Sequence, residues 1–246
     1  MAQSLRADDV PADMLNQGGE PIEKSVPVNA ARDVLRVRGW KTPDGRELYP
    51  DAGFDSAPGH ADVLATERLY QAAARAMPES AAAQLVHKTI QSPSGQAAWN
   101  AFVQQSLASP YSRGQNAVLG VLGEQDLAIA REMGKTAESR VVHVEDRLLI
   151  GKKAKRHQSD GNALSAAEWI ALPGKFARPT MRLWDTKRQT LILIYDSEDA
   201  RHIKIAVDVN RFRLGAGEKA NRAATVFKVK AADIQSGINN GLYEKK

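Results

Sequence analysis

The chain of 246 residues contains no cysteine. This absence excludes a disulfide scaffold, a thiolate zinc site and a cysteine nucleophile. Long apolar runs are also missing, because the strongest one, residues 191–195, is far too short to cross a bilayer. The first residues carry Asp8, Asp9 and Asp13 where a signal peptide would need an apolar segment. We therefore expect a cytoplasmic protein without membrane contact.

Several catalytic motifs are absent as well. The sequence has no GxxxxGK[ST] loop, no GxGxxG after a strand, no HExxH and no GxSxG. Only five histidines are present, so a structural zinc site is not expected either. These gaps argue against nucleotide hydrolysis and metalloprotease chemistry, and we predict neither a cofactor nor a metal.

Composition allows at least one ordinary hydrophobic core, with 43% hydrophobic and 26% charged residues. The charge is unevenly placed. Residues 1–134 hold 12 basic and 16 acidic residues, whereas residues 135–246 hold 22 and 13, giving net charges of −4 and +9. Clustered positive charge attracts phosphate backbones, so the second part is predicted to face a polyanion.

Residues 1–60 hold six of the 11 prolines. Proline removes a backbone donor and disfavours helix in the preceding residue, so this stretch is predicted to be an extended arm with a short helix at 28–36. Residues 61–134 are rich in alanine, with breaks at Pro78, residues 92–95 and Pro110. This second stretch is predicted to be a helical linker region of three or four short helices.

Residues 135–246 show a different pattern and are predicted to form a basic domain of their own. Ser165 and Glu168 form a capping box that begins a helix ending before Pro173. Three β-rich runs at 181–184, 190–195 and 202–209 predict an antiparallel meander. Further elements are predicted as strands at 141–144 and 225–229, a basic helix at 148–157 and a closing helix at 231–239. The predicted fold class is α+β, with a small antiparallel sheet and packed helices.

Residues 39–60, GWKTPDGRELYPDAGFDSAPGH, contain the run Pro50-Asp51-Ala52-Gly53-Phe54-Asp55-Ser56-Ala57-Pro58-Gly59. This run resembles the segment that ends the head-morphogenesis domain of phage Mu-type minor head proteins. The resemblance implies that the chain is the tail of such a protein or a separately encoded derivative.

Residues 141–243 carry a second resemblance, on KAKRH at 153–157, ALSAAEWIALP at 163–173, LWD at 183–185, the strand at 191–195, HIK at 202–204 and VDVN at 207–210. Together they resemble the phage-associated nucleases related to barnase, EndoU, colicin and RelE, which often follow the head-morphogenesis domain. The resemblance implies a metal-independent ribonuclease fold whose catalytic residues vary between members. It also implies RNA or another nucleic acid, an immunity protein, and phage capsid or portal proteins as partners.

Cleaving RNA without a metal needs a base for the 2'-hydroxyl, cations for the phosphate and an acid for the leaving oxygen. His157 titrates near neutral pH and shares a helix face with Lys153. Lys204 and Thr225 lie on predicted strands and could contact a phosphate. The predicted catalytic residues are thus His157, Lys153, Lys204 and Thr225, and the predicted nucleic-acid contacts are Lys152, Lys155 and Arg156.

Other interpretations stay open at this point. The basic run at 152–156 also fits a solvated helix end that complements the macrodipole, and Trp169 and Trp184 fit core anchors better than base-stacking platforms. The predicted function is a ribonuclease-like phage effector in the host cytoplasm or the virion. One alternative is a non-catalytic virion component that touches nucleic acid or the portal, and another is a scaffold of alanine-rich helices with the arm as a docking strand.

Overall fold

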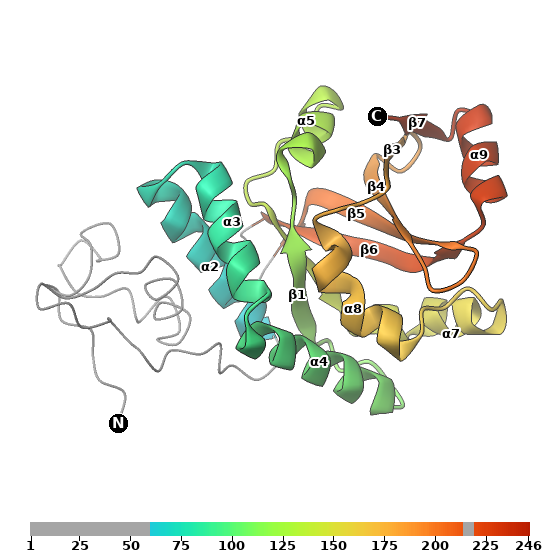
Figure 1. The fold of residues 1–246 in the computed structure, drawn as a ribbon, viewed down its shortest axis with the longest axis horizontal. Helices are drawn as coiled ribbons and strands as arrows, with labels where there is room; N and C mark the ends of the chain where they lie inside the picture. Colours follow the sequence, from blue (N-terminus) through green and yellow to red (C-terminus); the bar gives the residue numbers. More distant parts are fainter. Residues whose placement is uncertain (1–59, 214–218) are drawn as a thin grey trace, which may run out of the picture.

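The computed structural model describes residues 60–213 and 219–246 (Figure 1). The predicted arm, its helix at 28–36 and the resemblance at 39–60 therefore lie outside the described residues, apart from His60, which begins the first described helix. The helices are α2 (His60–Ala76), α3 (Glu79–Ile90), α4 (Pro93–Ala108), α5 (Glu124–Glu132), α6 (Arg147–Ile150), α7 (Lys152–Ser159), α8 (Ala166–Phe176) and α9 (Ala231–Asn239). The strands are β1 (Asn116–Val121), β2 (Val141–Glu145), β3 (Met181–Asp185), β4 (Thr190–Asp196), β5 (His202–Arg213), β6 (Lys219–Val229) and β7 (Tyr243–Lys245).

The described strands form one seven-stranded sheet in the order β1-β2-β6-β5-β4-β3-β7. Strand β3 pairs antiparallel with β4, and β4 with β5, so each strand pairs with the next one along the chain as the predicted meander requires. Strand β2 pairs with β6 in parallel, so the sheet is mixed and larger than the small antiparallel sheet that was predicted. The α+β fold class is confirmed.

Helices α2, α3, α4 and α5 lie in the alanine-rich stretch. The gaps near Pro78 and Pro110 agree with the predicted breaks, whereas α4 begins at Pro93, inside the break that was predicted at 92–95. The strand β1 in the same stretch has no counterpart in the sequence prediction. Its sequence, NAVLGV, is buried at five of six positions and shows no alternation of polar and apolar residues. Because both faces of β1 are covered, the period that identifies a half-exposed strand is missing.

The main hydrophobic core lies on one face of the sheet, under α4, α5 and α8 (Figure 1). Trp99 and Phe102 of α4 pack there with Trp169 of α8 and Trp184 of β3. Trp169 is 3% exposed and Trp184 fully buried, which confirms both as core anchors. On the opposite face, α9 places Ile234 over part of β3, β4 and β5.

Helix α8 does not end before Pro173 as predicted but continues to Phe176. A proline inside a helix leaves the carbonyl four residues earlier without its usual donor. Here that carbonyl belongs to Trp169, and it accepts a hydrogen bond of 2.9 Å from Nε1 of Trp99 on α4. The proline is therefore tolerated because a side chain from a distant helix replaces the missing donor.

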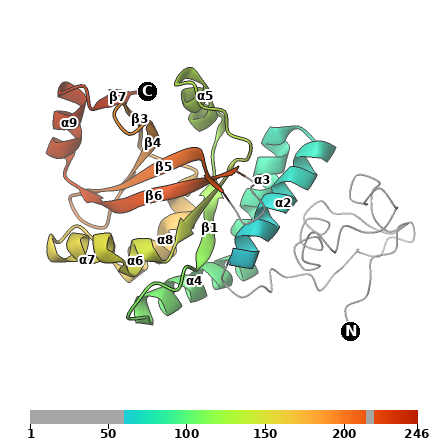
Figure 2. The same ribbon diagram turned by 180° about the vertical axis from the view of Figure 1, so that it is seen from behind.

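Strands β5 and β6 cross the middle of the sheet and turn one face away from the main core (Figure 2). Successive side chains of a strand point to opposite faces. In β5, Ile203, Ile205 and Val207 enter the main core, so Lys204, Ala206 and Asp208 project from the other face. Helix α9 covers this second face over β3, β4 and the start of β5, and the part of β5 and β6 that it leaves open supports the candidate site.

The predicted boundaries at residues 60 and 134 stay predictions, but contacts across residue 134 suggest how to test the second one. Truncating a buried aromatic side chain costs about 3–5 kcal/mol, against a total domain stability of about 5–15 kcal/mol. Trp99, Phe102 and β1 all precede residue 134 and belong to the sheet and its core. We therefore expect a fragment of residues 135–246 to unfold at much lower urea concentration than residues 60–246. Equal unfolding midpoints for the two fragments would instead favour an independent domain after residue 134.

Candidate functional site

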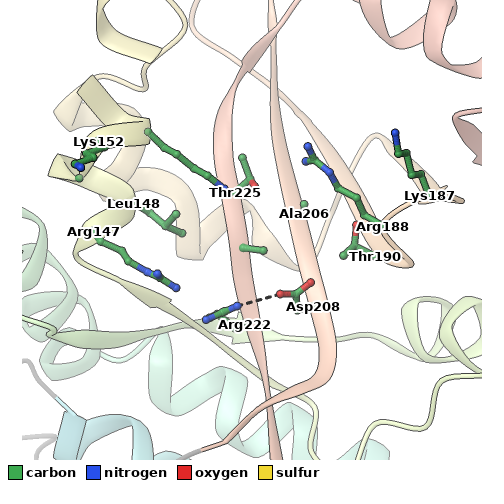
Figure 3. A pocket seen from close by; sticks show the side chains of 13 residues that line it. Arg147, Leu148, Lys152, Lys187, Arg188, Thr190, Ala206, Asp208, Arg222 and Thr225 are labelled. Carbon is green, nitrogen blue, oxygen red and sulfur yellow. Dashed lines mark hydrogen bonds and ion pairs between the residues drawn. The ribbon is translucent and has the colours of Figure 1, made fainter. Parts of the chain in front are cut away.

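A groove with a volume of about 780 Å³ lies on the open face of β5 and β6. Its residues come from α6, α7, the turn between β3 and β4, and the strands β4, β5 and β6 (Figure 3). They are Arg147, Leu148, Gly151, Lys152, Lys153, Lys187, Arg188, Thr190, Ala206, Asp208, Arg222, Ala224 and Thr225. We call this set the basic groove, because it holds six Lys and Arg residues and a single acid.

Strands β5 and β6 form the floor of the basic groove, and their register determines which residues lie there. Ala206 is paired with Thr225, and Asp208 is paired with Arg222, so both pairs lie on the same face of the sheet. The small side chains of Ala206 and Ala224 leave space above the strands. Larger side chains there would fill the groove, so its depth depends on these two alanines.

The two walls of the basic groove flank its floor on the same face of the sheet. Arg147 and Lys152 stand on the side of α6 and α7, whereas Lys187 and Arg188 stand on the side of the β3–β4 turn (Figure 3). Thr225 lies on the floor between the two walls. A ligand in the groove would therefore meet cations from both sides.

Some of these cations are neutralised within the protein. Arg222 forms ion pairs with Asp208 at 3.1 Å and with Glu145 at 3.6 Å, and Glu145 also pairs with Arg147. Lys152, Lys153 and Lys187 form no ion pair with any residue in the described parts of the chain. The groove thus keeps an excess of positive charge at its rim.

The structure places the predicted site residues in three different surroundings. Lys152, Lys153 and Thr225 line the basic groove together. Lys155 and Arg156 are exposed on α7 and do not line it. His157 and Lys204 lie beyond one end of the groove, where both contact the ring of Phe227.

His157 stacks on Phe227 with ring centroids 4.5 Å apart and planes within 2° of parallel. Burial of the imidazole lowers its pKa, and the charges of Arg156 and Lys153 lower it further against the opposing effect of Asp160. His157 therefore favours its neutral form at neutral pH. The side chain lines a smaller pocket of about 340 Å³ between α7 and α8 instead of the basic groove.

Lys228 lies in the same small pocket, but its charge is already compensated. Its ammonium forms ion pairs with Glu168 at 3.2 Å and Asp199 at 3.0 Å. Burial alone would lower the pKa of Lys228, yet the bonds to Asp199 and Glu168 raise it above its usual value. The small pocket is therefore a poor site for an anion.

Lys204 is 7% exposed and enclosed by aromatic side chains. Its Nζ donates a hydrogen bond of 2.5 Å to the hydroxyl of Tyr243 and lies 4.5 Å from the centroid of that ring. The same Nζ is 5.5 Å from the Phe227 ring centroid. Lys204 lines neither the basic groove nor the small pocket, so the four residues predicted as catalytic do not share one cavity.

The sequence prediction missed Arg147, Lys187, Arg188, Thr190 and Arg222. Lys187 and Arg188 belong to the charged run 185–189, which indicates a turn and gave no other signal. Arg222 lies in a strand that was predicted to begin only at residue 225. The basic residues of α7 are neighbours in the sequence and could be recognised there. Lys187 and Arg188 come close to them only when the sheet folds.

The basic groove is suited to hold phosphate groups, since ammonium, guanidinium and hydroxyl groups all donate hydrogen bonds to phosphate oxygens. Its lining contains no histidine, and its one carboxylate, Asp208, is ion-paired with Arg222. Among the described residues, no cluster of three or more His, Asp or Glu side chains is placed to hold a metal ion. The groove therefore offers binding groups without a general base in its own lining.

The pKa of His157 leads to a pH dependence of stability. Because folding lowers this pKa below its usual value of 6.5, the neutral ring contributes stability that is fully present above that pH. The contribution is lost as the pH falls through the folded-state pKa. His157→Phe keeps an aromatic ring on Phe227 but does not titrate, so the stability of the parent should fall relative to this variant on acidification. Urea unfolding across the acid range measures the difference, and a His157 NMR titration midpoint at or above 6.5 would contradict the account.

Comparison with known proteins links the chain to phages. It is 29% identical over 215 residues to the Mu-like prophage FluMu F protein of Haemophilus influenzae, an alignment that covers 82% of this chain and 49% of the relative. The chain spans about half the length of this curated relative. No family model matches the chain, and no solved structure matches it. No helix in residues 60–213 or 219–246 has the length and apolar character needed to span a bilayer. The chain is thus related to a phage protein, in agreement with the phage part of both sequence resemblances.

Proposed function

We propose that this phage-related chain is a virion protein that holds nucleic acid in its basic groove through phosphate contacts and does not cut it. The observation that carries the proposal is the excess of groove cations over acids, with Lys152, Lys153 and Lys187 unpaired among the residues that the structure describes. Unpaired lysines around a groove bind a polyanion by releasing its counterions. The similarity to a prophage F protein supports the virion part.

The composition of the groove favours contacts with the nucleic-acid backbone over contacts with bases. Proteins that hold single strands by their bases use aromatic side chains as stacking platforms. The groove lining contains no aromatic residue. Phosphate contacts fix the position of a nucleic acid without selecting its sequence. We therefore expect binding with little sequence preference.

Phage capsid or portal proteins are the protein partners that this proposal implies. The support is the relative, which is a prophage protein about twice as long as the aligned region. In this arrangement, the groove would hold nucleic acid while other surfaces of the chain contact the phage particle. An immunity protein belongs to the ribonuclease hypothesis alone.

Electrostatic binding predicts a steep salt dependence that originates in the groove. A full-chain variant with Lys152→Gln, Lys153→Gln, Lys187→Gln and Arg188→Gln should bind DNA more weakly at low salt. Its plot of log affinity against log salt concentration should lose about 0.7–0.9 in slope for each phosphate contact removed. Fluorescence anisotropy with labelled DNA over a salt series measures both quantities.

The matched control removes the same number of charges outside the groove, by Lys155→Gln, Arg156→Gln, Lys230→Gln and Lys245→Gln. These side chains are all exposed, and none lines the groove. The control should keep most of the slope, since only nonspecific attraction is reduced. Equal losses in the two variants would show that net charge, and not the groove, determines binding.

A ribonuclease remains the second candidate, and one observation favours it. The lowered pKa of His157 leaves a neutral imidazole at neutral pH, one helical turn from Lys153 of the groove. A neutral imidazole can accept the proton of a 2'-hydroxyl. No other residue of the predicted catalytic set supplies such a group.

The two candidates give opposite results with total RNA. The ribonuclease hypothesis predicts cleavage by the full chain that resists chelator and leaves 2',3'-cyclic phosphate ends. His157→Ala should then lower the rate by about 100- to 10,000-fold while binding is nearly unchanged. The binding proposal predicts no cleavage above that of a mock preparation. Cleavage that His157→Ala removes would overturn it.

A further inference from the structure

Helix α7 begins at the edge of the basic groove with two lysines in its first turn. Its sequence, KKAKRHQS, contains no acidic residue. The N-terminus of a helix carries a partial positive charge, so lysines there are unfavourable, whereas cations in the last turn are favourable. The macrodipole interpretation of the basic run therefore fits Arg156 and His157 but not Lys152 and Lys153. An anion at this end of α7 would remove the conflict.

The backbone N–H groups at the start of α7 also have no side-chain cap. The N-cap is Gly151, which has no side chain to accept hydrogen bonds from the first turn. A Cβ atom at this position would lie 2.4 Å from the carbonyl oxygen of Arg147, so a capping Ser, Thr or Asp does not fit without a shift of the backbone. The first N–H groups of a helix have no acceptor within the helix. Gly151, Lys152 and Lys153 all line the groove, so the start of α7 lies at its edge.

A second, independent observation lies on the opposite wall. Thr190 of β4 is 3% exposed, and its Oγ1 has no hydrogen-bond partner among the residues described. A buried hydroxyl without a partner costs free energy that a bound acceptor can recover. Thr190 lines the basic groove beside Arg188 and Lys187 (Figure 3).

These two sets of donors face the same groove from different sides, with Thr225 between them. We propose that they are two phosphate subsites of one phosphodiester strand that crosses β5 and β6. The first subsite consists of the α7 N-terminus with Lys152, Lys153 and Thr225. The second consists of Thr190 with Lys187 and Arg188. This inference rests on the proposed function and specifies its ligand as a strand with phosphates at both subsites.

A lone phosphate can occupy only one subsite at a time, whereas a strand occupies both. The affinity per molecule should therefore rise sharply once an oligonucleotide is long enough to reach from α7 to the β3–β4 turn, because the second contact becomes intramolecular. The probes are inorganic phosphate and single-stranded thymidine oligonucleotides of increasing length, added to the full chain.

The readout is the ¹⁵N–¹H NMR spectrum. Inorganic phosphate should shift the backbone amides of Lys152, Lys153 and Ala154, because these N–H groups bind the anion directly. In the variant Lys152→Gln/Lys153→Gln these shifts should persist with about two- to fivefold weaker affinity. Lys155→Gln/Arg156→Gln, on the same helix, should leave the affinity for phosphate nearly unchanged.

Thr190 tests the second subsite. Thr190→Val preserves the shape of the side chain and removes the hydroxyl. The variant should bind the longer oligonucleotides with about two- to tenfold lower affinity. The affinity for inorganic phosphate at α7 should stay unchanged. Thr190→Ser retains the hydroxyl and should restore oligonucleotide binding.

The outcomes separate this inference from the proposed function. If oligonucleotides bind in the groove but the amides of α7 do not shift, the first subsite is wrong and the groove proposal stands. If affinity does not rise with length or Thr190→Val has no effect, the two-subsite arrangement is wrong. If phosphate shifts the α7 amides but DNA does not bind in the groove, the function proposed above fails while the anion subsite remains.

Discussion

The alternation of side chains along β5 is the constraint on which the rest of the molecule depends. Ile203, Ile205 and Val207 enter the main core, and the residues between them must therefore face the other side. That second side is only partly covered by α9, so Ala206 and Asp208 line the basic groove between α7 and the β3–β4 turn. A shift of one residue in the register would place Lys204 and Asp208 in the core. The same apolar pattern that stabilises the sheet thus positions the floor of the basic groove.

Local patterns in the sequence predicted much of the fold. The β3–β5 meander and α9 follow from strand propensity and turn residues that lie close together in the chain. The parallel pairing of β2 with β6 has no local signal, because it joins segments far apart in sequence. The extension of α8 past Pro173 likewise needed Trp99, a partner supplied by tertiary packing. Local rules failed at these two places because distant residues decide the outcome.

The candidate site was predicted in the same partial way. The basic run pointed to Lys152 and Lys153, and the predicted strand at 225–229 pointed to Thr225, whereas the opposite wall with Arg188 and Thr190 gave no signal in the sequence. His157 instead stacks on Phe227, and Lys204 bonds to Tyr243 and lies over its ring, so aromatic contacts hold both side chains outside the groove. The positive charge of residues 135–246 predicts a polyanionic ligand, and that ligand stays a prediction, because the structure shows only where the cations gather.

The central claim is that groove lysines, and not basic surface in general, contact nucleic acid. The most direct measurement is the rate of chemical acetylation of each lysine in the full chain, with and without DNA, determined by mass spectrometry. Lys155, Lys230 and Lys245 are exposed lysines outside the groove and provide internal standards within the same molecule. The account predicts that DNA protects Lys152, Lys153 and Lys187 while the three standards react at their original rates. Protection spread evenly over all six lysines, or confined to the standards, would contradict it.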